Sequence, residues 1–575
     1  MLVDQIILTG IMLTLIVCLF GTRLNPAWLF VSAIGISYLT GLIELESMLV
    51  NYANPSLITL VLLILVSIAI EKTTLVQKLA STLASGSLSK SVMKLGLSTA
   101  FLSSFTNNTA VVASLISTIK ESQTHSPSKL LLPLSYTAIL GGTLTLIGTS
   151  TNLIVNGFAV DAGMAPLGFF DFTLVGIGAL VVGLLTILLL LKFLPDHGTE
   201  SEEVVPFYLE GKVALGSKLI GRTVEENGLR DLKDLFLAEI IRGERRICAV
   251  TPQQEIRQGD VLLFVGDIKS VPLLRQFNGL QIVHDKHEKD AEHLVEVVVS
   301  QSSKFIGKTI KEIRFREQFH AAVIAIRRGH DRLQGGLGQV KLQAGDSLIL
   351  APGSDFYALP DLKREFVYIS GLDLQTHLTQ KQSNHVLLGF AAVIGLGIFD
   401  IIPLVKGLMV LLLALVALGT IKVNEMKRRF PIELLAIVGS AIGLAKLMID
   451  TGLASKISDA LFLLLGDFGP YGAFIAIFVM TVVFTELVTN NAAAALSFPV
   501  AYALSVGFGV DPLPFIMAVA FGASASFISP FGYQTNLMVY SAGNYRIRDY
   551  VTVGVPLSII YSITVLTLIP LVFPF

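Results

Sequence analysis

Long apolar runs fill both ends of the chain, and a polar stretch separates them. Residues 1–194 and 385–575 are series of apolar runs, whereas residues 195–382 contain charged sequences such as DKHEKDAEH. An apolar run of roughly 17–25 residues is long enough to cross a bilayer as a helix. The pattern therefore predicts a polytopic α-helical membrane protein in two halves, with a soluble module inserted between them.

Each half is predicted to contain five membrane spans. They lie near residues 5–20, 27–43, 56–70, 131–157 and 172–194 in the first half, and near 385–400, 403–421, 432–449, 513–540 and 551–573 in the second. Alternating these spans places the loops rich in Lys and Arg on one side together with the soluble module, and the positive-inside rule assigns that side to the cytoplasm. Because five is an odd number, we expect the two halves to cross the membrane in opposite senses.

Two short motifs occur once in each half. SSFTNNTAVVA, which begins at Ser103, resembles ELVTNNAAAAL, which begins at Glu486. TLIGTSTNLIV, which ends at Val155, resembles SPFGYQTNLMV, which ends at Val539. Inverted repeats that carry the same broken polar segment are typical of transporters that work by alternating access, with a site near the middle of the membrane. We therefore expect a re-entrant helical hairpin around each TNN sequence.

The residue types in these motifs indicate an anion and a hard cation. A helix that begins inside the membrane directs free N–H groups and a partial positive charge toward an anion. Backbone carbonyls and the oxygens of Ser, Thr and Asn suit a hard cation such as sodium. The motifs contain no Lys or Arg. Cation-coupled anion symport is therefore the simplest mechanism, although amides in membranes can also serve only to join helices.

Composition agrees with a multi-spanning protein and excludes other classes. The 575 residues are 53% hydrophobic and 15% charged, and the mean hydropathy is +0.71. A net charge of −1 gives no reason to expect nucleic-acid binding. The chain has no metal-binding His cluster, nucleophile elbow or Walker loop, so we do not expect an enzyme. The insert lacks a GxGxxG sequence after a strand, so no dinucleotide is expected.

The motifs resemble those of the divalent-anion/sodium symporter family, within the wider ion-transporter superfamily. That family carries a Ser-Asn-Thr motif at each hairpin tip and a Gly-rich turn ending in Asn downstream. The resemblance assigns one sodium ion to Ser103, Asn107, Asn108 and the Gly148 backbone, and another to Thr485, Thr489, Asn490 and the Gly532 backbone. It assigns the substrate, a small inorganic or organic dianion, to Asn108, Thr109, Thr149, Asn490, Asn491 and Tyr533.

Departures from the family pattern bear on the substrate. The Pro-Pro pair usual in the turns is Ser150-Thr151 here in one half and Gln534-Thr535 in the other. The SPFGYQTNLMV form with an inserted module looks more like the sulfate-transporting branch, which makes sulfate the expected substrate. Dicarboxylate transport, proton-coupled anion transport and a transporter-like sulfate sensor remain alternatives. An ion channel is disfavoured because the TVGYG signature is absent.

The insert is itself duplicated. GSKLIGRTV and RQGDVLLFVG, which begin at residues 216 and 257, recur as SSKFIGKTI and QAGDSLILAP at 302 and 343, in both cases 86 residues later. Each copy is predicted to form a strand, a turn, a helix, and strands that end in a GD turn. The copies resemble the RCK-C domain of potassium-transport regulators, an α+β module that can pair and bind small effectors.

The resemblances complete the predicted organisation. The domains are membrane half 1 at 1–195, two RCK-C-like domains at 200–285 and 286–370, and membrane half 2 at 384–575. Both the family and the insert imply a homodimer. We expect it in the bilayer of the bacterial inner membrane, with the insert in the cytoplasm.

Overall fold

The computed structural model divides into two compact units. It describes residues 2–22, 24–73, 87–121, 125–196, 207–229, 232, 235–243, 245–248, 250–266, 274, 277–283, 295–300, 303–329, 331–333, 337–352, 356, 359, 362–369, 378–399, 401–465 and 468–575. The helical unit comprises Met1–Pro195, Leu374–Val539 and Ile547–Phe575. The β unit comprises Asp196–Asp373 and Tyr540–Arg546.

The two halves of the helical part contain the same succession of helices. The first half has α1 (Leu2–Gly21), α2 (Pro26–Leu39), α3 (Leu45–Asn51), α4 (Pro55–Glu71), α6 (Leu88–Ser103), α7 (Asn108–Glu121), α8 (Pro127–Gly142), α9 (Ser150–Asp161), α10 (Thr173–Leu189) and the short 3₁₀ helix η1 (Leu190–Phe193). The second half has α14 (Gln380–Ile398), α15 (Leu404–Ala417), α16 (Val423–Arg429), α17 (Ile432–Asp450), α18 (Leu453–Leu465), α19 (Gly469–Leu487), α20 (Asn490–Phe508), α21 (Pro512–Ala523), α22 (Gln534–Ala542) and α23 (Ile547–Val572). The sequence LASKISDAL in α18 resembles LVQKLASTL at residues 75–83, which lie outside the described residues.

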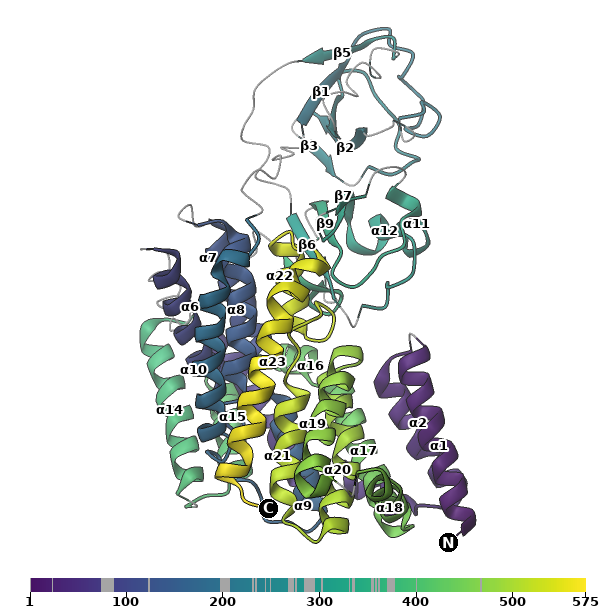
Figure 1. Ribbon diagram of the computed structural model, residues 1–575. Helices are drawn as coiled ribbons and strands as arrows, with labels where there is room; N and C mark the ends of the chain where they lie inside the picture. The colour runs from purple at the N-terminus through teal and green to yellow at the C-terminus, as the bar shows by residue number, and fades with distance from the viewer. Residues whose placement is uncertain are drawn as a thin grey trace. The chain divides into compact units, whose positions relative to one another are not determined.

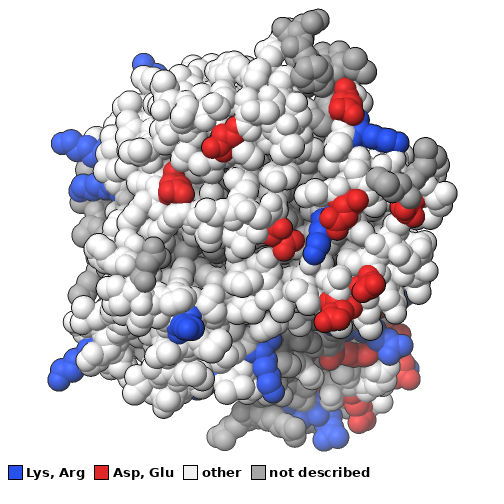
Figure 2. All heavy atoms as spheres, turned by 90° about the horizontal axis from the view of Figure 1, so that it is seen from below, with Lys and Arg blue, Asp and Glu red and all other residues white. Residues whose placement is uncertain are grey.

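The halves pack against each other along their length. Helix α2 contacts α17, α4 contacts α15, and α10 lies beside α23 (Figure 1). Large apolar side chains on the outer faces of the helices are exposed; they include Val17, Leu174, Leu185, Leu413, Ile559 and Ile563. Figure 2 shows the molecule from below, where uncharged residues make up most of the visible surface and charged side chains lie among them. The exposed apolar side chains along the outer faces of the helices are stable when lipid covers them.

Several helices meet the length and composition of a membrane span. Among the described residues, five helices qualify alone, at Thr173–Phe193, Ile432–Asp450, Gly469–Leu487, Asn490–Phe508 and Ile547–Val572. The pair Leu45–Asn51 and Pro55–Ile70 qualifies together, with a bend of 40°. The chain is thus a polytopic helical membrane protein with an inserted β-sheet region.

The structure corrects two of the predicted spans. Residues 131–157 and 513–540 were each expected to form one continuous span, but each contains two helices with a non-helical segment between them. The first break lies between α8 and α9, and the second between α21 and α22. Both breaks are rich in small and polar residues and contain the glycine of the repeated motif, Gly148 or Gly532. Such residues weaken a helix because Gly costs backbone entropy and hydroxyls compete for backbone groups.

The β unit contains two five-stranded antiparallel sheets. The first is built from β1 (Phe207–Val213), β2 (Leu235–Arg242), β3 (Arg245–Cys248), β4 (Val261–Gly266) and β5 (Leu280–Val283), in the order β3-β2-β4-β1-β5. The second is built from β6 (Val295–Val299), β7 (Ala321–Arg328), β8 (Asp331–Arg332), β9 (Ser347–Pro352) and β10 (Phe366–Ile369), in the order β10-β6-β9-β7-β8. Read in matching direction the two orders are the same, as the sequence repeat predicts.

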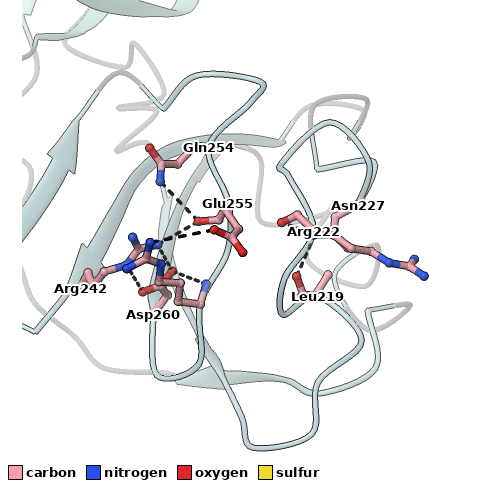
Figure 3. A network of polar contacts seen from close by, with 8 residues as sticks. Leu219, Arg222, Asn227, Arg242, Gln254, Glu255 and Asp260 are labelled. Carbon is pink, nitrogen blue, oxygen red and sulfur yellow. Dashed lines mark hydrogen bonds and ion pairs between the residues drawn. The ribbon is translucent and has the colours of Figure 1, made fainter.

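An ion pair recurs in both sheets. In the first, Arg242 Nε and Nη2 donate to the two oxygens of Asp260 at 2.8 and 2.7 Å, and Nη2 also donates to the Glu255 carbonyl (Figure 3). In the second, Arg328 makes the same bidentate pair with Asp346 at 2.7 and 2.8 Å. These hydrogen bonds raise the pKa of both arginines. Both aspartates are fully buried, so each needs its arginine.

Two local predictions for the insert are wrong. The GD turns, with Gly259 at φ +79° and Gly345 at φ +82°, precede β4 and β9 instead of ending the last strands. Their aspartates are the partners of the two arginines, which explains why the sequence repeats them. The helix expected at residues 225–232 is a run of turns over its described part. In the second copy the same position forms α11 (Ile310–Ile313) and α12 (Phe315–Phe319).

Candidate ion and substrate site

Two helical hairpins carry the TNN sequences. Helices α6 and α7 form the first and α19 and α20 the second, and the tips are the few residues between them. At the first tip, Asn107 Oδ1 accepts the Thr109 N–H at 2.9 Å. At the second, Thr489 Oγ1 accepts the Ala492 N–H at 3.4 Å. Both side chains are exposed and occupy the position that starts the second helix, where a side-chain oxygen satisfies a free N–H group.

Side chains from the two halves meet directly next to these tips. Asn108 Nδ2 donates to the Tyr533 hydroxyl at 2.8 Å. Thr109 Oγ1 donates to Gln534 Oε1 at 3.2 Å. A further hydrogen bond joins Thr149 to Tyr533. The first hairpin is therefore bonded to the second-half break, at the start of α22.

The reverse contact is also present. Ser150 Oγ, at the start of α9, donates to Asn491 Oδ1 at 2.8 Å. Ser150 and Gln534 occupy equivalent places in the two halves, because each directly precedes the Thr of the repeated Thr-Asn pair. The prediction from the sequence did not include Ser150 or Gln534 in the site. The sequence did contain a signal for these residues, because they replace the first Pro of the family's Pro-Pro pair in each turn.

Polar oxygen atoms without partners lie behind the first tip. Ser103 Oγ and Asn108 Oδ1 are buried and make no hydrogen bond. The backbone is close around them, because a Cβ built on Gly142 would lie 3.0 Å from Asn108 Oδ1. A Cβ on Gly148 would lie 2.5 Å from the Gly142 carbonyl oxygen. Buried oxygens without a partner are costly, and a bound cation would satisfy them.

The corresponding oxygens behind the second tip are mostly paired. Thr485 Oγ1 contacts Asn490 Oδ1 at 2.9 Å and the Ala523 carbonyl oxygen at 2.6 Å. Ser526 Oγ is buried and has no partner. A Cβ on Gly532 would collide with Ser526 Oγ and lie 3.1 Å from the Thr485 carbonyl oxygen. Thus Gly532, like Gly148, permits a close approach of backbone to polar oxygens.

Glu486 supports the second break. One of its carboxylate oxygens accepts the N–H groups of Phe527 and Ile528, both at 2.9 Å, and the other accepts that of Ser529 at 3.1 Å. These N–H groups belong to the non-helical segment between α21 and α22, which has no helical carbonyls for them. The Glu486 carboxylate therefore satisfies three backbone N–H groups of the second break.

The asparagine of each Thr-Asn pair closes its own break. Asn152 Nδ2 donates to the Thr145 carbonyl at 2.9 Å. Asn536 Nδ2 donates to the carbonyls of Ser526 at 2.9 Å and Ser529 at 3.2 Å. These bonds explain why the motif ends in Asn in both halves.

The structure thus brings most of the predicted site residues together. Asn108, Thr109, Thr149, Asn491 and Tyr533 form the contacts between halves, and Asn490 contacts Thr485 behind the second tip. Asn107 and Thr489 use their oxygens to start helices instead. Assignment of these residues to sodium and substrate remains a prediction.

Comparisons with known proteins identify relatives across the chain. A family model described as citrate transporter matches residues 6–520. An uncharacterized transporter of Synechocystis sp. is 30% identical over 560 residues, covering 93% of this chain and 91% of its own. A protein of Chlamydomonas reinhardtii, named a proposed sulfur deprivation response regulator, is 31% identical over 553 residues, covering 91% and 94%. Sodium/sulfate cotransporter 1 of the same alga is 28% identical over 380 residues, covering 63% of this chain and 43% of its own.

Proposed function

We propose that this chain, which belongs to the citrate transporter family, couples sodium entry to uptake of a divalent oxyanion, with sulfate as the main substrate. Membership of this family makes it a secondary transporter and not an enzyme. The family itself implies an anionic substrate in an integral membrane protein. The sodium/sulfate cotransporters among its relatives support the specific pair of solutes.

One observation carries this proposal. Ser103 Oγ and Asn108 Oδ1, on either side of the first tip, are buried oxygens without partners, and Asn108 also makes one of the contacts between the halves. Among the site residues described above, Glu486 alone carries a charge, and its oxygens accept three backbone N–H groups. A dianion at such a place needs many hydrogen bonds and a cation beside it. Sulfate is compact and accepts many hydrogen bonds.

The mechanism we propose is alternating access by two inverted repeats, each with a re-entrant hairpin. The matching succession of helices and the two broken spans support it, because such breaks are the usual place of the site in inverted-repeat transporters. Sodium would be held by Ser103, Asn108 and Gly148 in one half and by Thr485, Asn490 and Gly532 in the other, while Asn107 and Thr489 cap the helices that begin beside these sites. The substrate would contact Asn108, Thr109, Thr149, Asn490, Asn491 and Tyr533.

The insert is proposed to be two RCK-C-like domains at residues 200–285 and 286–370, between membrane halves at 1–195 and 384–575. The shared strand order of the two sheets supports the duplication. We place these domains in the cytoplasm, on the side of the basic loops, in a protein of the bacterial inner membrane. They would bind a small effector and help to form a homodimer.

Uptake of radiolabelled sulfate into proteoliposomes tests the proposed function. An inward sodium gradient should drive accumulation, whereas choline at the same ionic strength should not. Excess molybdate should compete with the label more strongly than succinate. Accumulation driven by a pH gradient without sodium would contradict sodium coupling, and stronger competition by succinate would contradict the substrate class.

A sulfate sensor is the second candidate, because one relative is named for the response to sulfur deprivation. A sensor would bind sulfate in detergent solution without moving it across a membrane. Sulfate binding by the purified protein, combined with no uptake in the same preparation after reconstitution, would favour this function over transport.

A further inference from the structure

We infer that the two cation sites are unequal and fill in a fixed order: the first-half site, on Ser103 and Asn108, is open and binds sodium first, whereas a hydrogen bond between Thr485 and Asn490 holds the second-half site closed. The inference rests on the proposed function and concerns the order of binding, which the repeat by itself does not indicate.

The first-half site is ready for an ion. Ser103 is 0% exposed and Asn108 is 3% exposed, yet Ser103 Oγ and Asn108 Oδ1 have no hydrogen-bond partner. Two oxygens therefore already bear the cost of lost hydration. A sodium ion that binds there gains ligands without breaking any contact within the protein.

The second-half site must rearrange before it can bind. Its equivalent side chains, Thr485 and Asn490, are already paired, because the single Thr485 hydroxyl proton is shared between Asn490 Oδ1 at 2.9 Å and the Ala523 carbonyl oxygen at 2.6 Å. Only Ser526 Oγ has no partner among the described polar side chains behind this tip. An ion could use the oxygens of both residues only after this proton had moved away from Asn490 Oδ1 to the Ala523 carbonyl.

The carboxylate of Glu486 does not reverse this order. It lies close to the second site, since a Cβ on Gly532 would be 3.4 Å from Glu486 Oε2. However, both of its oxygens accept backbone N–H groups from the break, and hydrogen bonds of this kind stabilise and localise the negative charge. Its contribution is therefore to hold the turn, and the closed pair decides the order.

A single side chain connects the two sites. Asn108 offers Oδ1 to the first site while its Nδ2 donates to the Tyr533 hydroxyl. A cation on Oδ1 draws electron density from the amide and strengthens the hydrogen bond that Nδ2 donates. Tyr533 directly follows Gly532, whose backbone borders the second site. Binding at the first site is thus transmitted to the turn of the second.

Sodium titration of the purified full-length protein tests the order. Thermal unfolding would be followed at constant ionic strength while sodium chloride replaces choline chloride, with potassium chloride as the control ion. Ser103→Ala and Ser526→Ala form a matched pair, because each removes one fully buried hydroxyl that has no partner. In the wild type, Tm plotted against the logarithm of sodium concentration should steepen at two concentrations, and each such step marks the filling of one site.

Ser103→Ala should move the first step to about tenfold higher sodium and carry the second step with it. Ser526→Ala should leave the first step in place and move only the second. A shift of the first step by Ser526→Ala, or an equal shift of one common step by both variants, would overturn the order while leaving sodium coupling intact. Failure of sodium to change Tm in the wild type, together with sodium-independent uptake, would instead overturn the proposed function.

Equilibrium binding of ²²Na⁺ to the wild type keeps the test independent of how the variants fold. The isotherm should contain two affinities that differ by about tenfold or more. One affinity for both ions would contradict the inference.

Discussion

The two halves of the helical part have nearly the same backbone plan and different polar contacts. In each, a capping oxygen lies at the hairpin tip, and a Thr-Asn pair lies in the first turn of the helix that follows the break. Yet the first half leaves Ser103 and Asn108 oxygens unpaired, while the second pairs Thr485 with Asn490 and adds Glu486. A repeated fold therefore fixes where polar atoms lie, and a few substitutions decide what those atoms can bind.

The largest expected effect comes from Asn108→Ala. This change removes an oxygen from the first cation site and the donor to Tyr533, so the combined loss is on the order of 3 kcal/mol, or more than a hundredfold in uptake. Initial rates of labelled sulfate uptake in proteoliposomes would measure it. The neighbouring Asn107→Ser is the matched control, because Ser can replace the exposed capping oxygen. Equal losses in both variants would contradict the distinction between capping and binding.

Glu486→Ala should come next. It leaves three N–H groups of the second break without acceptors, at a cost of roughly 3 kcal/mol spread over stability and uptake. Glu486→Gln retains one acceptor oxygen and should lose less. Tm and uptake measured on the same preparations separate the two effects. An alanine variant with normal Tm and abolished uptake would show that the carboxylate contacts a transported solute instead.

Gly148→Ala should reduce uptake by about tenfold, because its methyl group would lie 2.5 Å from the Gly142 carbonyl oxygen and push the first break away from Asn108. Gly10→Ala in α1 is the control, since nothing lies within 4 Å of its Cβ position. Uptake kinetics at several sodium concentrations would report the change. Unaltered sodium dependence in Gly148→Ala would exclude this backbone approach from the first cation site.

Ser150→Ala and Gln534→Ala should change substrate preference more than rate. Each breaks one hydrogen bond between halves, worth about 1 kcal/mol or a fewfold change in affinity. Competition of sulfate uptake by molybdate and succinate measures the preference. Identical competition profiles in the wild type and both variants would remove these residues from the substrate site.

The smallest expected effect concerns the insert. Thr309 and Glu312 form a capping box before α11, and the hydrogen bonds from Thr309 lower the pKa of Glu312 below its ordinary value of 4.5. The stabilisation is therefore present above about pH 4.5 and disappears as pH falls through the lowered pKa. Hydrogen-exchange protection factors at residues 309–315 of the full-length protein, corrected for the intrinsic exchange rate at each pH, should fall at acidic pH in the wild type, and Glu312→Gln should show a weaker dependence.

The sequence was most informative where a physical pattern is strong. Apolar runs placed most of the spans, and the repeated motifs identified corresponding places in the two halves, but continuous spans were wrongly predicted at 131–157 and 513–540, where the breaks lie. It could not show that Asn107 and Thr489 cap helices while Asn108 faces inward, because adjacent asparagines look alike in a sequence. Nor could it reveal the contacts of Ser150 and Gln534, which depend on how residues hundreds of positions apart pack. In the insert, the paired aspartates were visible as a repeat, but their arginine partners lie 18 residues away on another strand.

The hydrogen bonds of Asn108 with Tyr533 and of Ser150 with Asn491 have a consequence for how such a protein can arise. Each bond joins a residue of the first half to a residue of the second, so in a half-length protein the Asn108 and Ser150 donors would lack these acceptors. Two such proteins inserted in opposite orientations would supply each other's missing groups. A duplicated gene that joins them into one chain then allows the two copies to diverge. The difference between Ser103, which has no partner, and Thr485, which is hydrogen-bonded, is an example of such divergence.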